Sequence, residues 1–181
     1  MSRRARKWLK EVWQAAARTS GEMNRLSPVT TPLGNRLVES YVAGRRLDAG
    51  ELQRALRIAV VAGYASRMVL AEPTEQPSLA PSAFQLSAHP DLERLTADPA
   101  RLLDPVRTIA TDRFDSVMAL PPEVWTAYVA IATMKLQGQL TTKTLDWREF
   151  TRTRIEQMLR YGYVLRCLDE AIGAEPELRT S

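Results

Sequence analysis

The sequence predicts an all-α fold: a single-domain helical bundle of about six helices with a long proline-rich loop at residues 72–99. Apolar residues recur with a helical period through most of the chain, and prolines and glycines fall between the periodic segments. With 45% hydrophobic residues, a chain of 181 residues has enough apolar side chain for one core. The alternative is two helical halves, 1–71 and 100–174, joined by the loop and followed by a tail at 175–181.

The first two helices are expected before residue 45. Residues 2–26 carry an apolar stripe that includes Trp8, Val12 and Trp13, and Gly21 ends or interrupts this helix. A connector with two prolines follows at 27–32. A short amphipathic helix then extends from Leu33 to Val42, and Gly44 closes it.

The central helix is expected over residues 48–72. Asp48 stands at the N-cap and Glu51 three residues later, as in a capping box. From Ile58 to Ala65 the sequence is apolar on all sides, which in a soluble protein predicts contact with neighbours on several flanks. Pro73 ends the helix, because proline disfavours helical geometry in the residue before it.

The rest of the chain is expected to form one long loop followed by three helices. Five prolines and no helical period predict a surface loop over 72–99, with a short turn near Leu92 and Leu95. Helices follow at 104–120, 122–140 and 145–172, and Asp146 is placed as the N-cap of the last one. Gly162 lies inside that helix, where a glycine often permits close approach of a second helix.

The N-terminal segment is the most suggestive surface feature. Its basic and aromatic residues form a candidate anion- or partner-binding set: Arg3, Arg4, Arg6, Lys7, Trp8, Lys10 and Trp13. The cations are suited to nucleic-acid phosphates, or to an anionic membrane with the tryptophans in the interface. Alternatively, the tryptophans face the core or a protein partner and the charges are solvated.

Charge is unevenly distributed along the chain. Residues 1–70 hold thirteen Lys and Arg against five Asp and Glu, a net charge of +8. Residues 71–181 hold twelve against sixteen, a net charge of −4. Such an asymmetry indicates an anionic partner for the basic half or complementarity between the halves.

No constellation of catalytic residues stands out. His89 is the only histidine, so two-histidine metal motifs are excluded, and phosphate-binding glycine loops are missing. Asp112 and Asp115, spaced for one helix face, suit either magnesium or a solvated face with Arg107 and Arg113. Cys167 is the only cysteine, which excludes an internal disulfide and suggests a buried thiol in a reducing, cytoplasmic setting.

These observations leave three functional hypotheses. The first is a non-catalytic interaction, adaptor or assembly protein that binds a protein partner, including itself. The second is a nucleic-acid-binding protein that uses the basic N-terminal arm. The third is a small-molecule enzyme or sensor with a pocket between helices near Tyr128, Tyr161 and Tyr163. No cofactor, metal or membrane-spanning segment is expected, and peripheral membrane contact stays open.

Overall fold

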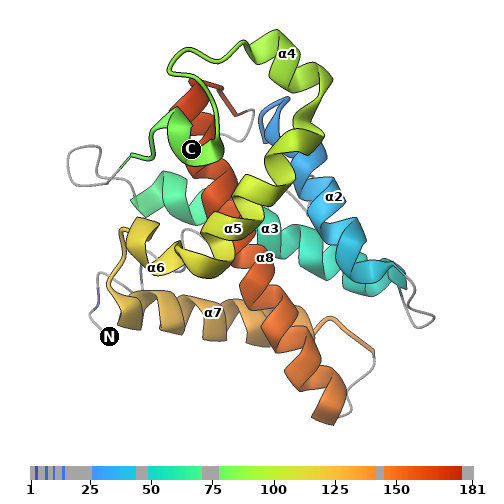
Figure 1. Ribbon diagram of the computed structural model, residues 1–181. Coiled ribbons are helices and arrows are strands. Elements are labelled where there is room, and N and C mark those ends of the chain that lie inside the picture. Colours follow the sequence, from blue (N-terminus) through green and yellow to red (C-terminus); the bar gives the residue numbers. More distant parts are fainter. Residues whose placement is uncertain are drawn as a thin grey trace.

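The fold is all-α, as the sequence predicted (Figure 1). The computed structural model describes Arg3, Lys7, Lys10, Gln14 and residues 26–43, 49–70, 78–141 and 145–176. Within these residues there are seven α-helices and no strand: α2 (Thr30–Val42), α3 (Ala49–Leu70), α4 (Leu92–Ala97), α5 (Leu103–Asp112), α6 (Phe114–Val117), α7 (Pro122–Gln137) and α8 (Leu145–Ile172). Two short 3-10 helices, η2 (Pro81–Phe84) and η3 (Pro99–Leu102), lie between α3 and α5.

The helices α3 and α8 cross in direct backbone contact at the centre of the molecule. A Cβ atom on Gly162 of α8 would overlap the carbonyl oxygen of Val60, and one on Gly63 of α3 would overlap the carbonyl oxygen of Leu159. Only glycine permits this approach, because any side chain at either position would push the two backbones apart. The close approach predicted for Gly162 is therefore confirmed, whereas the matching role of Gly63 was not anticipated.

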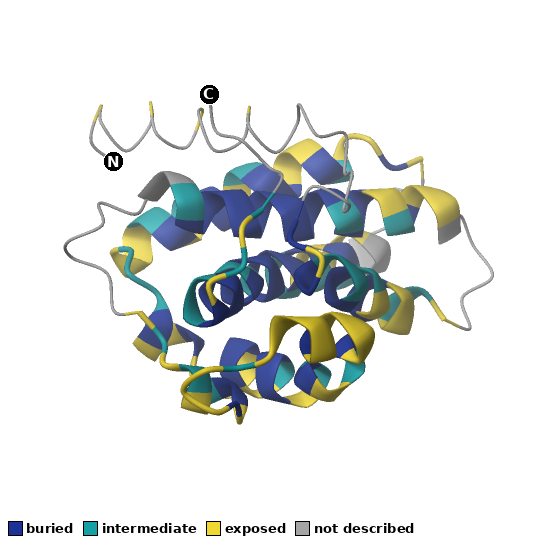
Figure 2. Cartoon of the chain, turned by 90° about the horizontal axis from the view of Figure 1, so that it is seen from above, coloured by how far each residue is buried: buried dark blue, intermediate teal, exposed yellow. Residues whose placement is uncertain are grey.

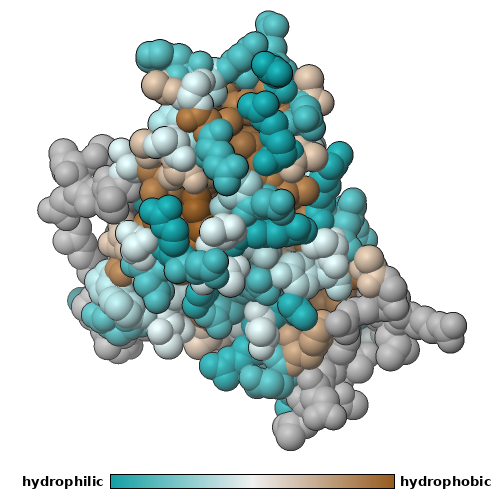
Figure 3. Space-filling view, in the orientation of Figure 1, coloured by the Kyte–Doolittle hydropathy of each residue, from teal (hydrophilic) through white to brown (hydrophobic). Residues whose placement is uncertain are grey.

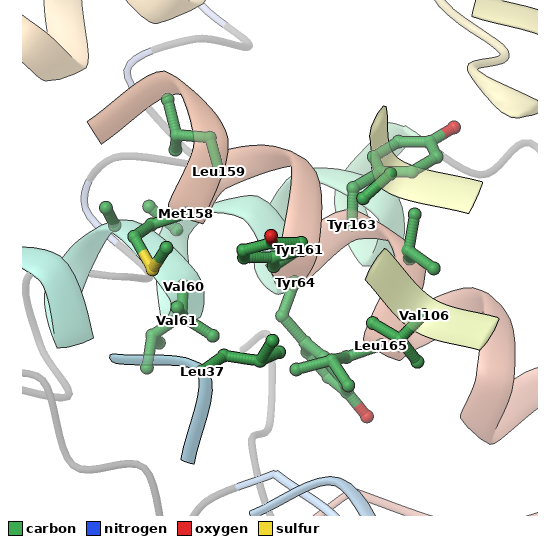
Figure 4. Close-up of a cluster of buried hydrophobic side chains, with 14 of the residues drawn as sticks. Leu37, Val60, Val61, Tyr64, Val106, Met158, Leu159, Tyr161, Tyr163 and Leu165 are labelled. Atoms are coloured by element: carbon green, nitrogen blue, oxygen red, sulfur yellow. The ribbon is translucent and has the colours of Figure 1, made fainter. Parts of the chain in front are cut away.

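The other long helices flank this crossing. Helices α2 and α7 each pack against both α3 and α8, and α5 packs against α8. Apolar side chains from α2, α3, α5 and α8 meet in one cluster that includes Leu37, Val60, Val106 and Leu165 (Figure 4). The inward faces of the helices are buried and the outward faces exposed, so the molecule has one continuous core (Figure 2).

The predicted burial of the central helix is confirmed. Every residue from Ile58 to Arg67 is buried, and the apolar side chains from Ile58 to Ala65 are between 0% and 6% exposed. Asp48 and Pro73, its predicted ends, lie outside the described residues. The carboxylate of Glu51 accepts hydrogen bonds from the amide and hydroxyl of Thr141, which ties the first turn of α3 to the loop after α7.

The proline-rich stretch contributes to the core. The short turn predicted near Leu92 and Leu95 is the helix α4, whose N-cap Asp91 accepts bonds from the amides of Glu93 and Arg94. Leu95 is 0% exposed and Phe84 in η2 is 1% exposed. The part of this stretch that the structure describes, from residue 78 onward, is therefore anchored by apolar side chains and is not purely a surface loop.

Two helix predictions were wrong in detail. The segment 104–120 forms two helices, because the backbone leaves helical geometry at Arg113, with φ −127° and ψ 8°. The last helix begins at Leu145, so Asp146 lies inside its first turn and is not the N-cap. The end of α8 agrees with the prediction, since Gly173 follows it with a left-handed φ of 70°.

The first predicted helix, 2–26, falls mostly outside the described residues. Arg3, Lys7, Lys10 and Gln14 are helical and exposed. In the described part of the chain, no helix combines the length and the hydropathy that a bilayer crossing requires.

Candidate functional site

A buried polar cluster lies where α3, α8 and the start of α2 meet. Asp169 of α8 is 0% exposed, and its carboxylate accepts hydrogen bonds from Ser27 Oγ at 2.6 Å, Thr30 Oγ1 at 2.9 Å and Tyr64 OH at 2.5 Å. The carboxylate of α8 therefore joins two segments that are far away in sequence, the residues at the start of α2 and the helix α3. A buried charge is tolerated only where such partners satisfy it.

Local sequence explains how the two short hydroxyl side chains are positioned. Residues 27–30 form a hydrogen-bonded turn that leads into α2, in which Ser27 Oγ accepts from the amides of Val29 and Thr30, and the Ser27 amide donates to Thr30 Oγ1. Pro28 has no amide hydrogen, so it leaves no unpaired donor in this turn. Residues 27–32 were predicted to be a connector, and Ser27 and Thr30 within it bind Asp169.

A second buried group extends the cluster along α3 and α8. Arg67 is 1% exposed, and its guanidinium donates to Glu170 Oε2 at 2.9 and 3.1 Å and to Tyr163 OH at 3.1 Å. The Arg166 guanidinium is within 3.2 Å of Glu170 Oε1 and lies over the ring of Tyr64. The two arginines balance the two carboxylates, Asp169 and Glu170, so the ionised cluster is neutral.

Burial shifts the protonation of two members of this region. It raises the pKa of Asp169 from about 3.8 to about 6, although the hydroxyl bonds and the charge of Arg166 oppose the shift. Burial also raises the pKa of the Cys167 thiol to about 12, so the thiolate that would act as a nucleophile is scarce at neutral pH. Cys167 is 0% exposed, as the sequence suggested.

We expect Asp169→Asn to change how stability depends on pH. The folded chain keeps the Asp169 proton up to about pH 6 and the unfolded chain only to about pH 4, so this group's contribution to stability falls as the pH rises between them. A shift of two pKa units corresponds to about 3 kcal/mol. Urea unfolding of both proteins at pH 4, 5, 6 and 7 should therefore show the wild type losing about that much stability relative to the variant. A difference that stays constant over this range would contradict the assignment.

The three tyrosines proposed for an inter-helix pocket lie at different places in the core. Tyr128 OH donates to the carbonyl of Ala62 at 2.9 Å, and Tyr163 OH accepts from the Ala119 amide at 2.9 Å. The rings of Tyr128 and Tyr163 both lie 6.0 Å from that of Trp125, so these two are neighbours through a shared tryptophan. Tyr161 faces α2 instead, where its hydroxyl is 3.2 Å from that of Tyr41.

Two adjoining hollows open on the surface between α5, α6 and α8. Their volumes are about 290 and 240 Å³, and Thr111 and Arg160 line both. Arg160 is ion-paired to Glu156 at 2.9 Å and lies over the ring of Phe114 at 5.0 Å. Hydrophilic residues cover much of this face, with hydrophobic residues visible between them (Figure 3). The hollows are thus lined by both acidic and basic side chains, and some of these already form ion pairs with each other.

The other sequence candidates are separated from one another. His89 is exposed in the segment before α4. Asp112 ends α5 and Asp115 lies in α6, so the expected shared helix face is wrong, and both are exposed. Arg107 approaches Asp104 at 3.7 Å instead. Among the described residues, no three His, Cys, Asp or Glu side chains are grouped to hold a metal ion.

The basic N-terminal candidates are described only in part. Arg3, Lys7 and Lys10 share one face of a helix, since they are spaced by four and three residues, and all three are exposed. We refer to these three residues as the basic row. Arg4, Arg6, Trp8 and Trp13 lie outside the described residues.

The fold and the cluster define an all-α protein whose interior contains a neutral, hydrogen-bonded set of charged residues. No family model matches this chain, and no curated protein or solved structure was found to be similar to it.

Proposed function

We propose that the protein is a non-catalytic helical interaction protein that works as an adaptor or assembly subunit. The observation that carries the proposal is the position of Asp169. Its pKa of about 6 suits acid–base chemistry, yet the carboxylate is 0% exposed and already accepts three hydroxyl hydrogen bonds. A group sealed in this way links three helices by hydrogen bonds and is closed to a substrate.

The surface features support the same proposal. The hollows beside Arg160 are open to solvent and hold partly paired charges, unlike the enclosed sites that bind small molecules. The basic row lies on an exposed side of its helix, along about 10 Å. A partner with an acidic surface is the complement of such a row.

The test is affinity capture from native cells after brief cross-linking. The double variant Lys7→Glu/Lys10→Glu reverses two charges of the basic row. Arg94→Glu/Arg101→Glu changes the net charge equally at exposed positions elsewhere. We expect one protein to be recovered with the wild type and the control, and lost with the first variant. Equal recovery with both variants would contradict a role for the basic row, and a monodisperse monomer in light scattering would exclude self-association.

A nucleic-acid-binding protein is the second candidate, favoured by the same exposed cations. Fluorescence anisotropy with duplex DNA and single-stranded RNA at 50, 100 and 200 mM salt separates the two candidates. If nucleic acid is the partner, affinity falls steeply with salt, and the two lysine substitutions weaken binding more than the control pair. The adaptor proposal expects no binding at 50 mM salt.

A further inference from the structure

Helix α7 is apolar on its outward side as well as on its buried side. Trp125, Tyr128 and Leu136 are buried in the core. The opposite side, which we call the outer α7 face, consists of exposed or half-buried residues spaced by three or four positions: Thr126, Ala127, Ala130, Ile131 and Met134. Met134 is 63% exposed, and the only other large apolar side chain that is exposed in the described part of the chain is Leu92, at 38%. Exposed apolar surface of this kind often marks a contact with another protein.

The polar side chains at this face already have hydrogen-bond partners within the chain. Thr126 Oγ1 donates to the Pro122 carbonyl at 2.9 Å, inside α7 itself. The side-chain amide of Gln137, at one border of the face, donates to the carbonyl of Arg148 in α8. Covering the outer α7 face with another protein would therefore leave neither donor unpaired, which avoids the cost of burying an unsatisfied polar group.

The charges of α7 lie at the two ends of this face and have opposite signs. Residues 124–134 contain no charged side chain. Glu123 in the first turn and Lys135 in the last turn are both exposed. A helix that is complementary to this face must therefore offer apolar side chains in its middle, a cation beside Glu123 and an anion beside Lys135.

A second copy of α7 in the antiparallel orientation meets this description. It brings its own Lys135 beside Glu123 and its own Glu123 beside Lys135, whereas a parallel copy brings like charges together. The midpoint between these two charged positions is position 129, so Ala130 is the residue of the outer α7 face closest to it. A small side chain at that point lets the two helix axes approach closely.

We propose that the outer α7 face is a homodimer interface, in which two copies of α7 pack antiparallel about a twofold axis near Ala130. Each copy contributes the same surface, as in other twofold dimers. The inference goes beyond the proposed function, because it uses a surface other than the basic row and holds whether or not the basic row binds a partner. Helix α7 has 16 residues and is about 24 Å long, so the contact is at the small end of specific interfaces and the dimer is expected to be weak.

The first test measures the self-association of the full chain by sedimentation equilibrium, at protein concentrations from about 1 to about 500 µM. Met134→Glu places a charge on the outer α7 face, and Leu92→Glu makes the matched change at the other exposed large apolar side chain, in α4. We expect the wild type and Leu92→Glu to approach the mass of a dimer as the concentration rises, and Met134→Glu to associate about tenfold more weakly or less. A wild type that stays monomeric at the highest concentration, or equal association of the two variants, would overturn the proposal.

The second test measures the orientation of the two copies and does not depend on a buried charge. Ala130→Cys and Glu123→Cys are introduced separately into the full chain, whose only natural cysteine, Cys167, is 0% exposed. In the proposed dimer the two copies of position 130 lie about 3 Å apart along the helix axis, and those of position 123 about 18 Å apart. A short bismaleimide should therefore link the Ala130→Cys chains into dimers and leave the Glu123→Cys chains unlinked. Equal linking of both variants, or linking of neither, would contradict the antiparallel pair.

Discussion

Gly162→Ala is expected to lower the free energy of unfolding by about 3 kcal/mol or more. The added Cβ would overlap the Val60 carbonyl oxygen and stand 2.7 Å from the amide nitrogen of Tyr64. Both atoms are backbone, so no side-chain rotation relieves the overlap, and α8 must move away from α3. Overpacking a core usually costs about 1–3 kcal/mol, and separating the central helix pair lies at or above the top of that range.

The control is Gly50→Ala, the same substitution in the first turn of α3. A Cβ at Gly50 meets nothing within 4 Å. Alanine has the higher helix propensity by about 1 kcal/mol, so this variant should be neutral or slightly more stable. Guanidinium unfolding followed by circular dichroism at 222 nm compares the two. The crossing would be misassigned if Gly162→Ala were as stable as Gly50→Ala.

Periodicity predicted the parts of the fold that local sequence determines. The bounds of α8 agree with the segment expected from its apolar face, and the burial of Ile58–Ala65 follows from an apolar run with no polar side. Gly162 was recognisable because a glycine interrupts a strong helical pattern. The role of Gly63 could not be recognised, because a glycine among alanines and valines does not interrupt the apolar pattern.

The polar cluster could not be predicted in this way. Asp169 and Glu170 follow Arg166 near the end of a long amphipathic helix, a pattern typical of a solvated face. What buries Asp169 is the arrival of Ser27 and Tyr64, which are 142 and 105 residues away in sequence. The periodicity of apolar residues within a helix gives no information about a hydrogen-bond partner so far away in sequence. A buried carboxylate of this kind is recognised only once the tertiary structure brings its donors together.

The burial of Arg67 could not be predicted from local sequence either. Its replacement should have the second large effect on stability. We expect Arg67→Ala to lower the free energy of unfolding by about 3–5 kcal/mol. Arg67 has the largest side chain among the residues that are almost fully buried, and it binds Glu170 and Tyr163 together. Its removal leaves a cavity and takes a charged partner from Glu170, whose side chain is 23% exposed.

Arg107→Ala is the matched control, because Arg107 is 3.7 Å from an Asp104 side chain that is 93% exposed. An exposed pair of this kind contributes about 0–1 kcal/mol. A double-mutant cycle with Glu170→Ala then separates the ion pair from the cavity, since a cavity alone gives additive losses. We expect a coupling energy of about 1 kcal/mol or more. If Arg67→Ala cost no more than Arg107→Ala, the buried arginine would not be what joins the C-terminal ends of α3 and α8.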